Sequence, residues 1–596
     1  MSQRPSRAPA RRVALLVGLA AWLLGAAAGP DRVDDFALLD HEGRSHRLSY
    51  YGDRKAVVLF VQGNGCPIAR GAIPSLAALR EAFPARDVTF LGLNANLQDD
   101  RESVAREVRE YGIDFPVLLD ETQLVAESLG LTRTAEVLLI ATDGWRIVYR
   151  GPVDDRLHYE VQRAPREAYL RDALRALLAG RAVETPVREA PGCLIHFPER
   201  DRSQRNGISY AHDVAPLLAR RCVSCHREDG VAPWAMTSYA MVRGWSPMIR
   251  EVVRTRRMPP WHADPAIGRF RNALALSADE QRTLTRWVEA GAPRGEGPDP
   301  LAEHALPPAP EWPLGSPDLV IRAPVQDIPA SGVVPYRYEQ VRVPIERDVW
   351  VREVDLRPSN PRAMHHGLGW IVYPDGHAVP PTEGPRFTSG MFAAYVPGRE
   401  AHPLPAGGGY FLPAGSSIRF QLHYTPTGRP ERDAPRLALY LSDRPLAYEL
   451  KTGAVASFDF AIPPGASDHR EVAVRTLERD ILVYQLSPHM HYRGKSMRLE
   501  AHHPDGRLET LLSVPSYHFN WQRRYILAEP LRLPAGTRLV ARAAFDNSER
   551  NPANPDPSAW VRYGEQTYEE MLFGYFLYRD VDAVTTARAG AGREAE

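Results

Sequence analysis

Cysteine is scarce in this sequence, with only 4 among 596 residues, and the last of them is Cys225. Disulfide bonds therefore cannot hold together the part of the chain that follows. An excess of charge is also missing, because Lys+Arg and Asp+Glu both number 73 and the formal net charge is zero. This balance excludes the basic surface typical of proteins that bind nucleic acids or acidic membranes.

Long apolar runs are missing as well, apart from one at the N-terminus. A basic segment, MSQRPSRAPARR, precedes VALLVGLAAWLLGAAAGP, which carries small residues at Ala26 and Ala28. This order is typical of a secretory signal peptide, here residues 1–28. We expect an exported, periplasmic protein without stable membrane insertion after cleavage. A retained signal that anchors the chain is the alternative, although the run is short of the ~20 residues that span a bilayer.

The length predicts several domains, since one domain usually holds about 100 to 200 residues. Short apolar strands alternate with helical segments in the first part of the chain, which indicates an α/β domain. Mostly helical sequence follows, and strand-like segments separated by PAG, PPG and PDG turns then indicate β-sandwiches. We predict an α/β domain at 31–190, an all-α domain at 205–298, a Pro-rich linker at 299–316, jelly-roll-like β-sandwiches at 317–447 and 448–582, and a disordered tail at 583–596.

The α/β domain contains a cysteine at the start of a predicted helix. Cys66 follows the strand-like AVVLFV, and the amide dipoles of a helix N-terminus favour a thiolate. The surrounding YYGDRKAVVLFVQGNGCPIARGAIPSLAALREAF resembles the thioredoxin-like redoxin and peroxiredoxin superfamily. The pattern is incomplete, because Gly63 replaces the peroxiredoxin threonine, a C-x-x-C pair would need cysteine at Gly63 or Ala69, and Ala135 replaces the expected cis-proline.

Cys193, in APGCLIHF, is the other cysteine available to this domain. It either resolves Cys66 in a redox cycle or pairs with it in a static disulfide. The incomplete pattern favours a static or vestigial site, since a reactive thiol normally lies in a more complete one.

The strongest single motif is Cys222-Val-Ser-Cys225-His226. C-x-x-C-H is the signature of covalent haem attachment, in which both thiols bond to the haem and the histidine is one axial ligand. The later helix LSADEQRTLTRWVEAGAP resembles the last helix of a cytochrome c, so we expect one haem c. For the second axial ligand we predict Met258, in RRMPPW, which resembles the methionine loop of that family. The competing candidates are Met236, Met241, Met248 and His262.

A pair of histidines marks the second half of the β region. His489 and His491 lie in SPHMHYRGKSM after the strand-like ILVYQL. Alternate residues of a strand share a face, so the two imidazoles project together and form a chelate for copper or zinc. Met571, in TYEEMLFGYFLY, alternates with Phe573 and Tyr575 and offers a soft third ligand.

A second group of histidines lies in the first half of the β region. His365 and His366 are adjacent in AMHHGLGW, and His423 lies in IRFQLHY, pointing away from the apolar face of its strand. Adjacent residues of a regular strand diverge, so joint ligation by His365 and His366 requires a twist or a strand end, which Pro361 and Gly367 favour.

Together these residues resemble the ligand set of the copper type II, ascorbate-dependent monooxygenases, the family of peptidylglycine hydroxylase and dopamine β-hydroxylase. The resemblance covers roughly residues 317–580. It implies two copper ions: an electron-relay copper at His365, His366 and His423, and an O2- and substrate-binding copper at His489, His491 and Met571. It also implies a substrate-binding role for Tyr575, whereas Ser487 and Phe573 replace the arginine and asparagine that hold a peptide carboxylate. Peptide amidation is therefore not expected.

We accordingly predict a periplasmic copper and haem oxidoreductase. In this interpretation an O2-dependent two-copper monooxygenase hydroxylates a C–H bond of an unknown small molecule, with electrons from an ascorbate-like reductant or a periplasmic redox protein, relayed by the fused cytochrome. One alternative is a non-catalytic copper and haem protein for electron transfer or copper handling, because copper binding alone does not establish O2 activation. A further alternative is a thiol-disulfide or peroxide redox protein that uses Cys66. No nucleic-acid partner is expected.

Overall fold

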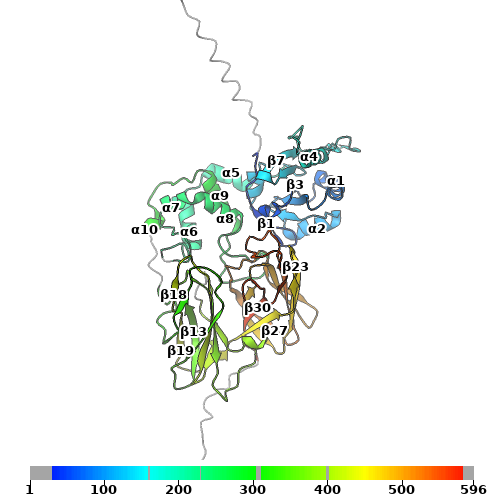
Figure 1. The fold of residues 1–596 in the computed structure, drawn as a ribbon. Coiled ribbons are helices and arrows are strands. Elements are labelled where there is room, and N and C mark those ends of the chain that lie inside the picture. The colour runs from blue at the N-terminus through cyan, green and yellow to red at the C-terminus, as the bar shows by residue number, and fades with distance from the viewer. Residues whose placement is uncertain (1–29, 159–160, 229, 304–309, 397–401, 582–596) are drawn as a thin grey trace, which may run out of the picture. The chain divides into compact units, whose positions relative to one another are not determined.

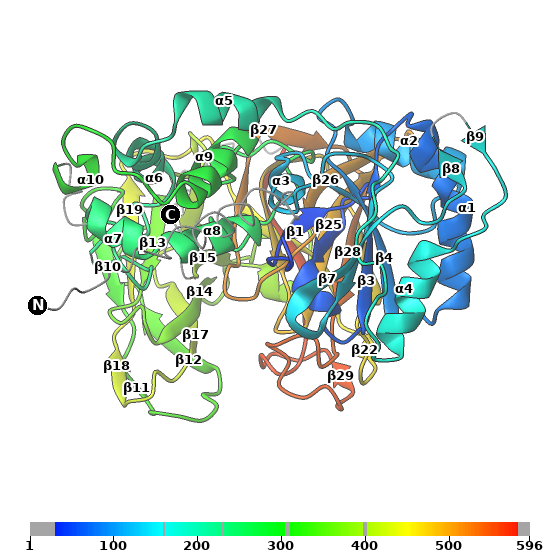
Figure 2. The ribbon, with the colours of Figure 1, turned by 90° about the horizontal axis from the view of Figure 1, so that it is seen from above.

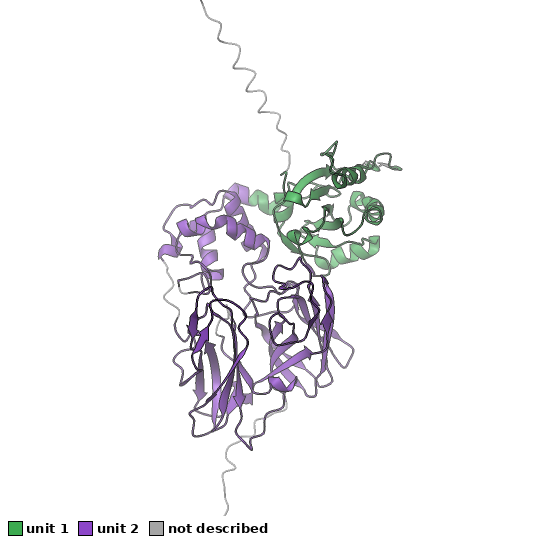
Figure 3. Cartoon of the chain, in the orientation of Figure 1, with its two compact units in different colours: residues 1–42, 46–202 green, residues 43–45, 203–596 purple. Residues whose placement is uncertain are grey.

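The structure, a computed structural model, describes residues 30–158, 161–228, 230–303, 310–396 and 402–581. The chain divides into two compact units, of which the first contains residues 46–202 and the second residues 203–581 (Figure 3). The predicted signal peptide, 1–28, and tail, 583–596, lie outside the described residues. None of the helices in the described part of the chain combines the length and apolar character that a membrane span requires.

The first unit is built on a five-stranded sheet with the strand order β5-β4-β3-β6-β7 (Figure 1). β3 pairs in parallel with β4, and β6 is antiparallel to both β3 and β7. Every residue of β3 is buried, because alternate side chains enter different cores: Val58 and Phe60 one, Val57 and Leu59 the other. The predicted thioredoxin-like α/β domain is thereby confirmed, and the unit continues past the predicted end at 190 to Arg202.

The elements up to this point are β1 (Ala37–Leu39), β2 (Ser45–Arg47), η2 (Leu48–Tyr51), β3 (Ala56–Gln62), α1 (Pro67–Ala82), β4 (Val88–Asn94), α2 (Arg101–Tyr111), β5 (Val117–Leu119), α3 (Leu124–Ser128), β6 (Val137–Ala141), η3 (Asp143–Trp145), β7 (Arg146–Gly151), β8 (Leu157–His158), β9 (Val161–Gln162) and α4 (Tyr169–Leu178).

The second unit begins with short helices, as the sequence predicts for this region. Ser277 is the N-cap of α9 and forms a capping box with Glu280, which fixes the start of that helix. α10 lies inside the predicted linker, so part of that segment is helical. α5 (Pro198–Asn206) begins in the first unit and ends in the second. The helices that follow are η4 (Tyr210–Val214), α6 (Ala215–Arg221), α7 (Tyr239–Gly244), α8 (Ser246–Arg254), α9 (Ala278–Glu289) and α10 (Pro300–Glu303).

The first β-sandwich packs the sheet β10-β19-β13-β16-β20 against the sheet β12-β17-β14-β15. Ile418, Phe420 and Leu422 of β17 enter its core, together with Leu356 of β13. The strands and the 3-10 turn are β10 (Leu319–Arg322), β11 (Gln326–Ile328), β12 (Arg337–Arg342), β13 (Val349–Arg357), β14 (Met364–Val372), η5 (Arg386–Thr388), β15 (Met391–Tyr395), β16 (Gly408–Leu412), β17 (Ser417–Tyr424), β18 (Glu431–Asp433), β19 (Arg436–Ser442) and β20 (Tyr448–Glu449).

The second β-sandwich packs the sheet β21-β30-β24-β27 against the sheet β23-β28-β25-β26. The two sandwiches lie side by side in both views of the ribbon (Figures 1 and 2). The all-β antiparallel architecture predicted for this region is thus present. The strands are β21 (Lys451–Ser457), β22 (Ala461–Ile462), β23 (His469–Thr476), β24 (Ile481–His489), β25 (Gly494–His502), β26 (Leu508–Val514), β27 (Tyr525–Leu533), β28 (Arg538–Phe545), β29 (Val561–Arg562) and β30 (Leu572–Asp580).

Candidate functional site

Cys66 and Cys193 lie in contact in the first unit. Cys66 is the N-cap of α1 and is buried, whereas Cys193 is exposed, and both are free thiols. Their Sγ atoms are 3.0 Å apart, with the Cys193 thiol donating to Cys66. The hydroxyl of Thr134 also donates to the Cys66 sulfur, at 3.0 Å. The structure thus brings together two cysteines that are far apart in the sequence.

The environment of the two thiols separates their pKa values. Burial opposes ionisation of Cys66, but hydrogen bonds from Cys193 and Thr134 outweigh it and lower the pKa of Cys66 below its ordinary value. The hydrogen bond with Cys66, followed by burial, raises the pKa of Cys193. Cys66 is therefore the more acidic of the two thiols, and Cys193 is the sulfur that solvent reaches.

Two glycines allow this close packing. A Cβ on Gly192 would lie 1.7 Å from the backbone oxygen of Thr134, so only glycine lets the Cys193 loop approach. A Cβ on Gly63 would lie 2.7 Å from Cγ2 of Thr134. Gly63, which breaks the peroxiredoxin pattern in the sequence, thus leaves room for Thr134. Gly63 stands where the peroxiredoxin pattern has a threonine, and the hydroxyl that hydrogen-bonds to Cys66 comes from Thr134 instead. No motif in the sequence singled out Thr134.

The first histidine group forms a compact cluster in the second unit. The antiparallel register pairs His366 on β14 with His423 on β17, and a β-bulge between Met364 and His366 makes His365 the extra residue. One ligand atom from each histidine lies within 4.8 Å of the others. Nδ1 of His365 is 3.3 Å from Nδ1 of His366, while Nδ1 of His423 and Nε2 of His365 are buried without a hydrogen bond.

The electrostatics of this cluster favour neutral imidazoles. Burial lowers the pKa of His365 to about 4 and that of His423 to about 3, and it lowers the pKa of His366 well below its ordinary value. Neutral imidazoles with unshared nitrogen lone pairs are the form that binds copper or zinc. The residues present therefore fit a metal ion.

The second histidine group lies where β24 and β30 end. The strand register places His489, the last residue of β24, opposite Phe573 of β30. His491 follows the end of β24 and Met571 precedes the start of β30, so both lie at the same end of the sheet. Nδ1 of His489 donates to Gln522 at 2.7 Å and Nδ1 of His491 donates to the Glu569 carbonyl at 3.2 Å. These bonds leave both Nε2 atoms for a ligand, and Nε2 of His491 is buried without a partner.

A buried carboxylate holds this loop in place. Glu570 accepts hydrogen bonds from the backbone N–H groups of His491 at 2.8 Å, Arg493 at 2.6 Å and Met571 at 3.2 Å. Burial raises the pKa of Glu570 to about 7. Because Glu570 joins the histidine segment to the methionine segment, it positions the proposed ligands relative to each other. Its position before Met571 was visible in the sequence, but its bonding was not.

One aromatic ring touches both histidine groups. Phe519 stacks on His365 with ring centroids 4.4 Å apart, and it meets His491 edge-on at 5.9 Å. Its neighbour His518 stacks against His262 at 6.2 Å. A packed path thus leads from the segment after Met258 to His365. No spacing in the sequence pointed to Phe519.

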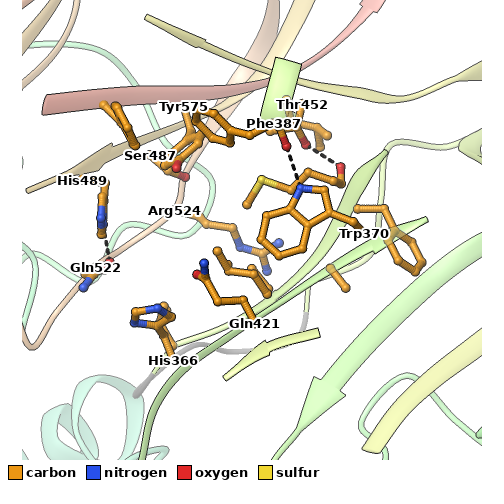
Figure 4. A pocket seen from close by; sticks show the side chains of 18 of the residues that line it. His366, Trp370, Phe387, Gln421, Thr452, Ser487, His489, Gln522, Arg524 and Tyr575 are labelled. Carbon is orange, nitrogen blue, oxygen red and sulfur yellow. Dashed lines mark hydrogen bonds between the residues drawn. The ribbon is translucent and has the colours of Figure 1, made fainter. Parts of the chain in front are cut away.

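A cavity of about 460 Å³ opens between the sandwiches, lined by residues of both. His366 lines it from the first sandwich and His489 from the second (Figure 4). Met571 of the second sandwich also lines it. Tyr575, predicted to contact substrate, lines the same cavity. Three predicted ligands, one from the first group and two from the second, therefore face one space together with Tyr575.

The C-x-x-C-H motif follows α6 in a tight turn. The His226 N–H and the Cys225 N–H both donate to the Cys222 carbonyl, at 2.9 and 3.1 Å. Nδ1 of His226 donates to the Trp234 carbonyl at 3.1 Å, which leaves Nε2 for an axial bond. Burial raises the pKa of Cys222 to about 12, whereas the pKa of Cys66 is lowered, so Cys222 is the less acidic thiol. These residues fit haem attachment.

Met258 follows α8 and is half-buried. The adjoining Trp261 packs into the core of the second sandwich, and the carbonyl of Pro260 accepts a hydrogen bond from Arg523 at 3.1 Å. Met258 as the second axial ligand of a haem stays a prediction.

Comparison with known proteins identifies the first unit. Residues 30–151 match the AhpC/TSA family. The thiol-disulfide oxidoreductase ResA of Halalkalibacterium halodurans is 30% identical over 119 residues, 20% of this chain and 65% of that protein. ResA of Geobacillus thermodenitrificans is 28% identical over 110 residues, 18% of this chain and 62% of that protein. The matched part of the chain thus spans less than two thirds of the length of these relatives.

Solved structures are also similar to part of the chain. The hypothetical protein SMc02350 from Sinorhizobium meliloti 1021 is 28% identical, with a TM-score of 0.27, and the match covers 29% of this chain and 95% of that one. An uncharacterized conserved protein from Geobacillus kaustophilus is 27% identical, with the same TM-score of 0.27, and covers 29% and 94%. The first unit contains a thioredoxin-like redoxin domain related to thiol-disulfide oxidoreductases.

Proposed function

We propose that the first unit catalyses thiol-disulfide exchange through Cys66 and Cys193. The observation that carries this proposal is the 3.0 Å contact between a buried sulfur of lowered pKa and an exposed sulfur of raised pKa. This arrangement assigns different roles to the two sulfurs. It also favours an active pair over the static or vestigial pair expected from the sequence.

Exposure determines which sulfur meets the partner. In the oxidised protein a partner thiolate attacks Cys193, the Cys66–Cys193 bond breaks, and Cys66 leaves as a thiolate. Leaving is faster for a thiol of low pKa. A second thiol of the partner then attacks the partner's sulfur in the mixed disulfide, so Cys193 is released, the partner becomes a disulfide and both cysteines are reduced. The reverse sequence reduces a disulfide partner.

Trapping tests this order. A Cys66→Ser chain should accumulate a mixed disulfide at Cys193 when it is treated with oxidised glutathione, because no second sulfur can resolve it. A Cys193→Ser chain should react far more slowly at Cys66, because that sulfur is buried. Mass spectrometry of the intact chains and their peptides measures both adducts. If glutathione instead formed a mixed disulfide rapidly at Cys66 in the Cys193→Ser chain, and none at Cys193 in the Cys66→Ser chain, the roles of the two sulfurs would be the reverse of those assigned.

A second function is favoured by the two histidine groups that face one cavity in the second unit. We propose that His365, His366 and His423 hold one copper ion and that His489, His491 and Met571 hold another. Two copper ions would supply O2-dependent oxidation of a C–H bond, with electrons delivered from a haem at Cys222, Cys225 and His226. Support comes from buried imidazole nitrogens without hydrogen-bond partners and from Met571, a soft ligand that lines the cavity together with His489.

The chain's own residues prepare this site. Gln522 and the Glu569 carbonyl fix the ring orientation of the two histidines, and Glu570 holds the methionine segment against them. Phe519 provides contact between the two groups, and the His262–His518 stack extends it toward Met258.

Metal and haem analysis tests the second proposal, together with O2 consumption over a panel of small substrates. Two coppers and one haem per chain with substrate-dependent O2 uptake support oxidation. Two coppers with redox cycling only would favour a copper-handling or electron-transfer protein. Absence of copper from protein supplied with it would contradict both.

A further inference from the structure

The cavity between the sandwiches contains an arginine that pairs with none of the residues that the structure describes. Arg524 is half-buried and lines the cavity, and Figure 4 shows its side chain extending toward the middle of the lining residues. Its guanidinium forms no hydrogen bond or ion pair with the described residues, although arginine offers five donors. Burial lowers the pKa of Arg524 to about 10, so it remains a cation at neutral pH.

The carboxylates nearest to Arg524 are engaged elsewhere. Glu353 accepts the backbone N–H of Leu404, with both oxygens 2.9 Å from that nitrogen. Asp355 pairs with Arg357 at 2.6 Å. Glu353 and Asp355 attract Arg524 electrostatically, but neither forms a hydrogen bond or an ion pair with its guanidinium, so the planar donor fork can still hold the carboxylate of a ligand.

Aromatic side chains form one wall of the lining near Phe573. Phe387 lies 5.3 Å from Phe573 and 6.3 Å from Tyr575 between ring centroids, and Trp370 faces the same space. Aromatic rings pack favourably against such walls. A cavity of about 460 Å³ is the size of sites that hold small molecules.

Two other charged side chains line the cavity. Glu565 accepts a hydrogen bond from the Tyr338 hydroxyl at 2.8 Å, and Arg419 is exposed, with its guanidinium 5.5 Å from the centroid of Trp370. The charged side chains of the lining are therefore Arg419, Arg524 and Glu565, and the carboxylates of Glu353 and Asp355, outside the lining, also act on Arg524.

We propose that this cavity binds a small aromatic acid, with the carboxylate on Arg524 and the ring against Phe387, Phe573 and Trp370. The ring would then lie in the space that His489 and Met571 also face. Binding itself needs no metal, whereas oxidation of this acid rests on the proposed copper function.

Binding of phenylacetate to the full-length, metal-free protein tests the proposal, with neutral phenylacetamide as the matched probe. Calorimetry should show phenylacetate binding at least tenfold more tightly than phenylacetamide. Arg524→Gln should remove this preference, and Arg352→Gln, on β13 outside the cavity lining, should retain it. No binding of phenylacetate, equal binding of both probes, or an unchanged preference in Arg524→Gln would overturn the proposal.

A second variant covers the case in which Arg524→Gln does not fold. Arg524→Lys keeps the charge and should keep the preference for phenylacetate with weaker affinity, so equal binding of both probes to it would overturn the proposal. Copper analysis of the same preparations separates the two proposals. Protein that binds phenylacetate through Arg524 but binds no copper would support the acid site and contradict the copper function. Protein that binds copper but no phenylacetate would support copper binding and contradict the acid site.

Discussion

Replacing Thr134 by valine removes the hydroxyl that donates to Cys66 at 3.0 Å and nearly preserves the side-chain shape. A hydrogen bond to a charged group contributes about 1.5 to 3 kcal/mol. Because one pH unit corresponds to about 1.4 kcal/mol, the pKa of Cys66 should rise by roughly 1 to 2. The reduced form loses this stabilisation and the disulfide does not, so the reduction potential should fall by roughly 30 to 60 mV.

Equilibration with dithiothreitol buffers at pH 8, followed by alkylation and mass spectrometry, measures this potential. Thr142→Val is a matched control, because Thr142 lies at the other end of β6 and donates to the Arg54 carbonyl rather than to a sulfur. Its potential should equal that of the unaltered chain. An unchanged or raised potential in Thr134→Val would refute the claim that this hydroxyl stabilises the Cys66 thiolate.

Other substitutions address the remaining parts of the account. Gly192→Ala places a Cβ 1.7 Å from a backbone oxygen, so Cys66–Cys193 disulfide formation should slow at least tenfold in quenched alkylation; an unchanged rate would contradict the packing argument. Glu570→Gln disturbs three backbone hydrogen bonds and should cost the second unit about 1 to 3 kcal/mol in urea unfolding, against no loss for the exposed Glu549→Gln. His491→Ala should reduce bound copper from two to one per chain, and retention of both would exclude it as a ligand.

The sequence predicted much of the first unit but assigned its thiols differently. Apolar strands and the position of Cys66 at a helix start follow from local patterns, and the structure confirms them. Thr134 and the Cys193 loop meet Cys66 only through tertiary packing, so no local pattern reveals them. Gly63 was interpreted as a loss of function, whereas it provides space for Thr134.

In the β region, periodicity predicted strands and the shared face of the histidines. The pairing of His366 with His423 depends on strand register and on a bulge, which a single sequence does not specify. The loop between β26 and β27 contains Phe519, Gln522 and Arg524. Tertiary packing sets the path of this loop, so no regular spacing in the sequence marks these residues. The copper and haem assignments stay predictions, since the family match covers residues 30–151.

The central claim is that Cys66 and Cys193 form a reversible disulfide, and peptide mapping of the full-length protein tests it directly. After equilibration with oxidised glutathione, a single cross-linked peptide pair containing Cys66 and Cys193 should appear, and it should disappear after reduction by dithiothreitol. Cys66 that remains alkylatable as a free thiol under oxidising conditions, or that pairs with Cys222 or Cys225 instead, would contradict the claim.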